Sequence, residues 1–237
     1  MSPMPTAIAV RHEAPQDGPE IARLLILNPN TNPEVTHRVQ QVADGFASKG
    51  LQLEVRNPSR GPFSIENPQQ RSQAEREVLA LLRAMPQPLP HAIVLACFDD
   101  LALHEARALT GRPVVGACEA GMAAARVISP RFSIVTTVHA ALPGIRNLME
   151  RYGAGAGASA HAAGIGVAVA ARAGPEALDA ITEVSQRAMR DHGAEAILLA
   201  SGGLAALAPS LAKRLGIPVV DGVHAAIAHA LALLKST

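Results

Sequence analysis

The sequence reads AIVLAC at residues 92–97 and AILLAS at residues 196–201. Five of the six aligned pairs are identical or are a cysteine matched with a serine. Each segment is a short apolar run, which is typical of a strand buried inside a parallel sheet. The pair predicts that a β-α unit occurs twice, with Cys97 and Ser201 at equivalent positions at the carboxyl ends of their strands.

The sequence around these two segments repeats as well. A helical pattern follows each of them and leads to Pro-Val-Val, at residues 113–115 and again at residues 218–220. Upstream, the apolar stretch 23–27 parallels the stretch 131–135. Regular alternation of strand and helix patterns predicts parallel sheets with right-handed crossovers. We therefore expect an α/β protein of two pseudo-symmetric, doubly wound lobes, with the active site in the cleft between them.

The lobes can be bounded along the chain. We expect a first lobe at residues 23–118, completed by a returning segment at 217–237, and a second lobe at 119–216. Residues 1–22 contain prolines and charged side chains but no apolar core for a signal peptide, so we expect a mobile extension outside the fold.

Composition excludes several classes of function. The 237 residues are 49% apolar and only 2% aromatic, so the core must consist mainly of Ala, Val, Leu and Ile. A net charge of +1 gives no attraction to nucleic acid or to an anionic membrane, and no apolar run approaches the ~20 residues of a membrane span. Two cysteines make no disulfide framework, so we expect free thiols and a cytoplasmic protein.

Cys97 is the first candidate for chemistry. A thiol at a strand end, before a helix, is expected to have its pKa lowered by the backbone N–H groups of the helix start. Asp99 and Asp100 act in the opposite direction unless they point away or cap the helix, because a nearby negative charge raises a thiol pKa. Cys118, in contrast, is expected to be a structural cysteine.

Polar side chains also follow the first strand of each half. Asn28-Pro29-Asn30-Thr31 forms a turn and a helix cap after residues 23–27, and Thr136-Thr137 holds the corresponding place in the second half. Amide and hydroxyl groups at strand ends are suitable ligands for a carboxylate or an imide.

Several segments together resemble the Asp/Glu/hydantoin racemase family, and above all its hydantoin and allantoin racemase branch. The resemblance runs in order from about Arg23 to the C-terminus. The matching segments are LNPNT (27–31), GPFSIE (61–66), ACFDD (96–100), VVGACEA (114–120), FSIVTT (132–137) and LASGGL (199–204).

The resemblance implies racemisation or epimerisation without a cofactor, by 1,1-proton transfer between two cysteines that flank the α-carbon of a small amino-acid-like or cyclic ureide substrate. A thiol titrates near neutral pH, so one can act as base while the other acts as acid. Cys97 matches the first cysteine. The residues that match the substrate-holding loops are Asn30, Thr31, Phe98, Asp99, Thr136, Thr137, Gly202 and Gly203.

This sequence departs from the family pattern at the second cysteine, which is replaced by Ser201. A hydroxyl is a far weaker acid than a thiol, so symmetric two-thiol chemistry is not expected. Three explanations stay open: an engineered Cys→Ser change, a one-thiol enzyme, or a Ser201 that only binds substrate. The rival functions are decarboxylation of a malonate-type acid with stereospecific protonation, and small-carboxylate binding without turnover.

No cofactor or metal is expected. The histidines lack metal-ligand spacing, and the glycines at 153–157 follow a predicted helix instead of a strand, unlike a nucleotide-binding loop. The expected partners are a small-molecule substrate and further copies of this chain, because an alanine-rich surface favours self-association.

Overall fold

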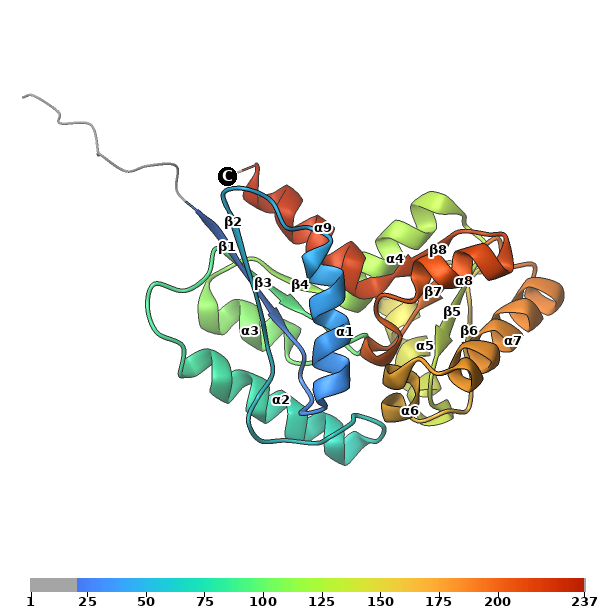
Figure 1. Cartoon of the computed structure of the whole chain (residues 1–237), viewed down its shortest axis with the longest axis horizontal. Helices are drawn as coiled ribbons and strands as arrows, with labels where there is room; N and C mark the ends of the chain where they lie inside the picture. Colours follow the sequence, from blue (N-terminus) through green and yellow to red (C-terminus); the bar gives the residue numbers. More distant parts are fainter. Residues whose placement is uncertain (1–20, 237) are drawn as a thin grey trace, which may run out of the picture.

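The computed structural model describes residues 21–236, which form two α/β lobes (Figure 1). Each lobe contains a four-stranded sheet in which every pairing is parallel. The strands of the first sheet are β1 (Ala22–Leu27), β2 (Leu51–Arg56), β3 (Ala92–Leu95) and β4 (Val114–Gly116). Those of the second are β5 (Phe132–Thr136), β6 (Ser159–Ala162), β7 (Ala196–Leu199) and β8 (Val219–Asp221). The expected fold class is confirmed.

The two sheets have the same topology. Their strand orders are β2-β1-β3-β4 and β6-β5-β7-β8, so the repeat in the sequence is a repeat in space. In each sheet the chain leaves the first strand toward one edge and later returns to add strands on the other side. In such sheets the crevice for a ligand opens beyond the carboxyl ends of the two central strands. Those strands are β1 and β3 in one lobe and β5 and β7 in the other.

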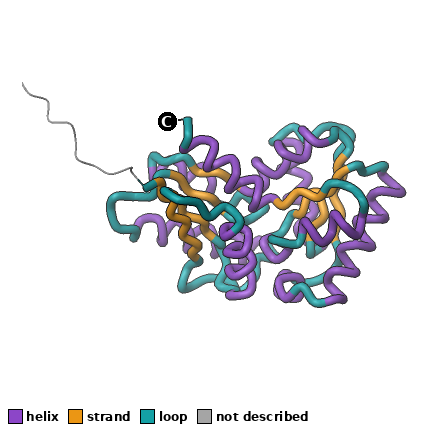
Figure 2. Tube along the Cα trace, turned by 45° about the horizontal axis from the view of Figure 1, so that its top comes forward, coloured by secondary structure: helices purple, strands orange, loops and turns teal. Residues whose placement is uncertain are grey.

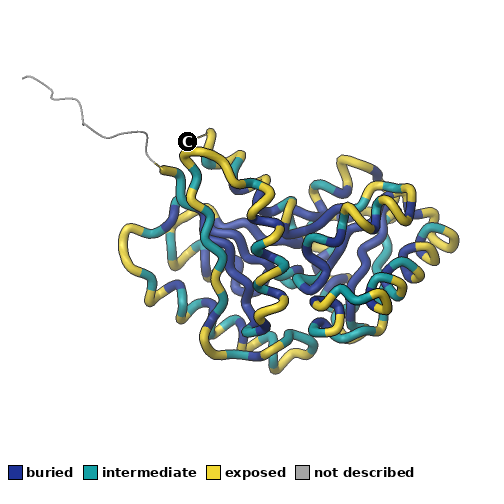
Figure 3. The backbone as a smooth tube through the Cα atoms, in the orientation of Figure 1, coloured by how far each residue is buried: buried dark blue, intermediate teal, exposed yellow. Residues whose placement is uncertain are grey.

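The helices cover the faces of the sheets, so that the strands lie inside each lobe (Figure 2). β3 and β7 are buried along their whole length (Figure 3), which explains why each is a continuous apolar run. The helices are α1 (Pro33–Asp44), α2 (Pro68–Arg83), α3 (Leu103–Thr110), α4 (Ala117–Ile128), α5 (Leu142–Arg151), α6 (Val167–Arg172), α7 (Pro175–His192), α8 (Ala208–Leu215) and α9 (Gly222–Leu234), with short 3-10 helices η1 (His139–Ala141) and η2 (Gly202–Leu204). No helix within residues 21–236 has both the length and the apolar character needed to cross a membrane.

Two helices pass between the lobes. α4 follows the last strand of the first sheet, but Cys118, Met122 and Ala125 on it pack with Phe132 and other residues of the second lobe. α9 follows β8 of the second sheet and returns to the first lobe.

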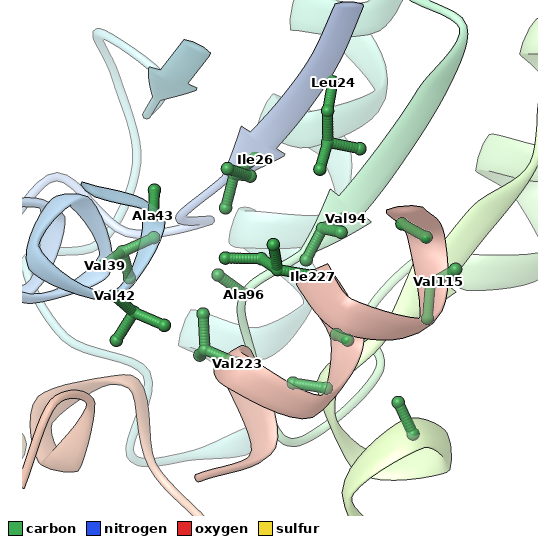
Figure 4. Packing of buried hydrophobic residues seen from close by; sticks show 14 of the residues in the cluster. Leu24, Ile26, Val39, Val42, Ala43, Val94, Ala96, Val115, Val223 and Ile227 are labelled. Carbon is green, nitrogen blue, oxygen red and sulfur yellow. The ribbon is translucent and has the colours of Figure 1, made fainter. Parts of the chain in front are cut away.

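Figure 4 shows the return of α9, with Val223 and Ile227 packed against Ile26 and Val94 of the first sheet. The chain enters α4 at Ala117, so the boundary expected at residue 119 falls inside this helix. The boundary expected at residue 217 is one strand too early, because β8 pairs with β7 in the second sheet and only α9 belongs to the first lobe.

The segment 160–170 combines two elements. It contains the end of β6 and, from Val167, the short helix α6. Alanine and glycine dominate this stretch, so it has little contrast between faces, and α6 owes its helix to packing against α1 and η2. The extension expected at 1–22 falls outside the described residues except for Ile21 and Ala22, and Ala22 already begins β1.

Candidate active site

A pocket lies where the carboxyl ends of four strands meet. Its polar and catalytic candidates follow β1, β3, β5 and β7, which are the two central strands of each sheet. Residues of both lobes therefore line one hollow. The lining residues are Pro29, Asn30, Ile65, Ala96, Cys97, Phe98, Asp99, Thr136, Thr137, Val138, Ala141, Ile145, Val167, Ala200, Ser201 and Gly202.

Cys97 and Ser201 hold equivalent positions in the two lobes. The N–H of Ala96 donates to Leu27 O at 2.8 Å, and the N–H of Ala200 donates to Val135 O at 2.8 Å. These are corresponding hydrogen bonds of the two sheets, and the next residue in each case turns out of the sheet into the pocket. Both side chains are partly exposed there. The alignment of AIVLAC with AILLAS is thus a spatial equivalence.

The environment of Cys97 raises the pKa of its thiol. Burial is the main cause, and the negative charge of Asp99 adds to it, while the backbone N–H of Asp99 and the Arg71 guanidinium act in the opposite direction. The expected lowering of this pKa by a helix start is wrong. The loop 97–102 intervenes, and α3 begins only at Leu103. At neutral pH the resting thiol is therefore protonated, and it is a strong base once ionised.

Asp99 is held by an arginine of the first lobe. Arg71 Nη1 lies 2.9 Å from Asp99 Oδ2, and Arg71 Nη2 donates to Asp99 O at 3.1 Å. Burial raises the pKa of the Asp99 carboxyl, and the Arg71 charge opposes that rise. The ion pair fixes the side chain next to the thiol and partly neutralises its charge there.

The polar wall of the pocket is preorganised. Asn30 is buried, and its Oδ1 accepts from Asn28 Nδ2 at 3.1 Å and from the N–H of Asn32 at 3.0 Å. Within residues 21–236 its Nδ2 donates to no protein group, so it remains for a ligand. Thr136 Oγ1 donates to Ala200 O at 3.0 Å and joins two of the lining loops, whereas the Thr137 hydroxyl has no partner among these residues. Donors held in place in this way can stabilise negative charge that develops on a substrate oxygen.

Other lining residues form an apolar wall, and they were not predicted from the sequence, although Ile65 lies inside the GPFSIE segment. Besides Ile65 the wall comprises Val138, Ala141, Ile145 and Val167. Glu66 Oε1 accepts from the N–H of Val167 at 2.9 Å, which links the loop of Ile65 to α6 of the second lobe. Apolar residues were missed because their spacing does not distinguish them from the core.

Two predicted site residues do not line the pocket. Thr31 donates to Pro62 O through both its N–H, at 3.0 Å, and its hydroxyl, at 3.3 Å, and so fastens a neighbouring loop. A Cβ on Gly203 would lie 2.8 Å from Val167 O, so this glycine allows α6 to approach η2 closely. Cys118 is fully buried in α4, outside the lining of the pocket.

Comparison with known proteins identifies the family of this chain. The model of the Asp/Glu/hydantoin racemase family matches residues 24–230. The hydantoin racemase of Rhizobium meliloti is 33% identical over 88% of this chain and 87% of its own length. That of Pseudomonas sp. (strain NS671) is 31% identical over 88% and 84%. The structure of allantoin racemase from Klebsiella pneumoniae has a TM-score of 0.85 and 34% identity, covering 90% of this chain and 88% of the other. The chain belongs to the Asp/Glu/hydantoin racemase family, in its hydantoin and allantoin racemase branch, and is an isomerase.

Proposed function

We propose that the chain moves a proton at the α-carbon of a small cyclic ureide or amino-acid-like substrate, without a cofactor, and that Cys97 is its acid/base. The observation that carries the proposal is the equivalent placement of Cys97 and Ser201 at strand ends of the two lobes, facing one pocket. The names of its relatives, hydantoin racemase and allantoin racemase, favour a five-membered ureide ring.

In this proposal the polar and apolar walls have separate roles. Removal of the α-proton places negative charge on the neighbouring carbonyl oxygen, and Asn30 Nδ2 and the Thr137 hydroxyl are the donors available to stabilise it. The apolar wall around Ile145 and Val167 accommodates the substituent on the α-carbon. Asp99 adjusts the acidity of the thiol through its charge.

Ser201 makes the chemistry one-sided. A hydroxyl has a pKa far above that of a thiol, so Ser201 cannot exchange roles with Cys97 as an equal acid/base. We expect α-proton exchange of one enantiomer in D2O to be faster than loss of optical rotation. Equal exchange of both enantiomers would contradict this part of the proposal.

A second candidate function is stereospecific decarboxylation of a malonate-type acid. It is favoured by the observation that Cys97 is the only thiol among the residues lining the pocket. After loss of carbon dioxide, one thiol suffices to protonate an enediolate on one face. Release of carbon dioxide from a disubstituted malonate, measured with no exchange on hydantoins, would favour this function over racemisation.

The deciding experiment is proton NMR of α-proton exchange in D2O with hydantoins, allantoin, aspartate and glutamate. It compares this chain with Ser201→Cys, and Cys97→Ser is the control that should lose exchange. Racemisation by Ser201→Cys of a substrate that the parent only exchanges would support proton transfer from two walls. Identical behaviour of the two proteins would overturn it, and tight binding without exchange in either would point to a binding protein.

We also propose self-association and a cytoplasmic location. The two unpaired cysteines, Cys97 and Cys118, are compatible with a reducing compartment. Light scattering of the purified chain measures its oligomeric state directly.

A further inference from the structure

Asp100 is a buried carboxylate that the proposed chemistry does not use. Its Oδ1 accepts from the N–H of Cys118 at 2.9 Å, and its Oδ2 accepts from the N–H of Glu119 at 2.9 Å. Oδ2 also accepts from the hydroxyl of Tyr152 at 2.8 Å. The side chain, which follows β3, therefore caps the start of α4, which follows the neighbouring strand β4, and it receives a third donor from the residue after α5.

The backbone around Asp100 has an uncommon conformation. Asp100 has φ +48° and Ala102 has φ +56°, and both values lie in the left-handed region that costs free energy for residues other than glycine. A Cβ on Gly116 would lie 2.2 Å from Asp100 Oδ1. The carboxylate can reach α4 only because residue 116 is glycine, so loop and strand end are fitted to each other.

We call this connection between a loop and a helix start a joint. The second half contains a corresponding joint, in which the carboxylate belongs to the strand end instead of to the loop. Asp221, at the end of β8, accepts from the N–H of Val223 in α9 at 2.8 Å and from the N–H of Ala206 at 2.7 Å. It thus ties the loop after Ser201 to a helix start, as Asp100 ties the loop after Cys97. The first joint alone includes a tyrosine hydroxyl from α5.

The joint at Asp100 couples the two lobes. Asp100 lies three residues after Cys97 on the first lobe, whereas Tyr152 follows α5, whose buried residues Ile145 and Leu148 belong to the core of the second. Ile145 also lines the pocket. A single carboxylate therefore connects the loop that carries Cys97 to the lobe that carries Ser201.

We propose that Asp100 is a positioning residue, which holds Cys97 at the reacting distance from the α-carbon by fastening the loop 97–102 to α4 and to Tyr152. The inference rests on the proposed function. A displacement of about 1 Å at a reacting group can cost on the order of 100-fold in rate. Asp100→Asn should lower kcat strongly, because its amide donors would face the N–H and O–H donors that the carboxylate now accepts.

The experiment compares Asp100→Asn, Tyr152→Phe and the matched control Asp221→Asn. In the last, a buried helix-capping carboxylate is changed in the same way at the other joint. We expect kcat for α-proton exchange to fall by about 30- to 100-fold in Asp100→Asn and by about 5-fold in Tyr152→Phe, with KM within about 3-fold of the parent. Tyr152→Phe keeps the ring, so it tests the joint even if Asp100→Asn does not fold.

Alkylation of Cys97 by iodoacetamide, located by peptide mass, supplies a measurement that does not need turnover. Its pH profile should change in Asp100→Asn, which also removes a charge that raises the Cys97 pKa, and in Tyr152→Phe, which keeps that charge and loses only the hydrogen bond. It should stay as in the parent in Asp221→Asn, although the two Asp→Asn variants lose similar thermal stability. If both variants lose stability and activity alike and neither changes the profile at Cys97, Asp100 is merely structural and the inference is overturned. If the parent exchanges no substrate, the proposed function fails, while the alkylation profile still decides the role of Asp100.

Discussion

At the scale of single residues, charge around Cys97 sets its reactivity. Asp99 raises the pKa of the thiol and Arg71 lowers it, and these two side chains form an ion pair 2.9 Å apart. A positive and a negative charge thus act on one sulfur from adjacent positions. Removing the Asp99 charge should lower the thiol pKa, and removing the Arg71 charge should raise it.

We predict that Asp99→Asn speeds alkylation of Cys97 at pH 8 by about 3- to 10-fold, as expected for a fall of up to one pKa unit. Arg71→Gln should slow it, because the Asp99 charge then acts without compensation. Both rates are measured by peptide mass after timed exposure to iodoacetamide. Equal rates in the two variants would show that neither charge reaches the sulfur.

A second prediction uses Tyr152, which is the only tyrosine in a chain without tryptophan, so it provides the intrinsic emission of the protein. Burial raises the pKa of Asp100 to about 6, while the N–H groups of Cys118 and Glu119 and the Tyr152 hydroxyl oppose the rise and the Glu119 charge adds to it. Asp99 and Cys97 are the titratable neighbours on the same loop. Tyr152 emission, quenched by the carboxylate, should increase as the pH falls through about 6.

Asp100→Asn should abolish that transition, whereas Asp221→Asn should keep it. The same titration affects stability. The folded pKa lies above the value of about 4 in an unfolded chain, so this carboxyl contributes stability that is fully present below pH 4 and is lost as the pH rises through about 6. A stability curve without any gain between pH 6 and pH 4 in the parent, relative to Asp100→Asn, would contradict this assignment.

At the scale of elements, α6 is a short helix held at both ends by the first lobe. Glu66 Oε1 accepts from the N–H of Val167 at its start, and Arg38 Nε donates to Ala171 O near its end, at 2.6 Å. Six residues are too few for a helix to persist by itself. The two contacts therefore keep Val167 in the wall of the pocket.

Glu66→Ala should raise KM by about 3- to 10-fold with a smaller effect on kcat. Loss of the hydrogen bond lets Val167 move in the apolar wall, whereas Cys97 stays in place. Hydrogen exchange at residues 166–171 should increase in the same variant. Gln69→Ala, at an exposed position of the following helix, is the control and should resemble the parent. Unchanged hydrogen exchange in Glu66→Ala would show that α6 does not depend on Glu66.

The elements also show which features the sequence could predict. Runs such as AIVLAC specify buried strands by themselves, because composition and length suffice for a strand covered on both faces. α6 could not be predicted, since its residues are alanine and valine with one final arginine, and its partners Glu66 and Arg38 lie about a hundred residues away. In the same way Asn30, Cys97 and Thr136 were predicted to belong to the site from strand ends, whereas Ile145 and Val167 reach the pocket only through tertiary packing.

At the scale of the whole molecule, the lobes are joined where α4 and α9 cross. A Cβ on Gly222 would lie 2.9 Å from Ala117 O, and a Cβ on Gly121 would lie 2.9 Å from Leu198 Cδ1. Both glycines let one helix approach the other closely, since the Cβ on Gly121 would also lie 3.2 Å from Gly222 Cα. The contact at Gly222 is to backbone, which cannot move aside as a side chain can.

Gly222→Ala should therefore lower the free energy of unfolding by about 1–3 kcal/mol, as overpacking of a close contact does. Gly144→Ala is the matched control: it lies in α5 with no atom within 4 Å of the added Cβ, and it should stabilise the protein by up to about 1 kcal/mol through helix propensity. Chemical denaturation of the two variants measures both signs. Stabilisation by Gly222→Ala would mean that the helices cross less closely.

The crossing of α4 and α9 bears on how such a chain could arise. Each half ends in a helix that covers the other half's core, so a half-length ancestor could have closed its fold only by lending that helix to a second copy. The present protein then corresponds to a domain-swapped homodimer whose two subunits have been fused into one polypeptide. A fusion of this kind would free the two halves from identity, so that equivalent positions can differ, as the thiol at residue 97 and the hydroxyl at residue 201 do.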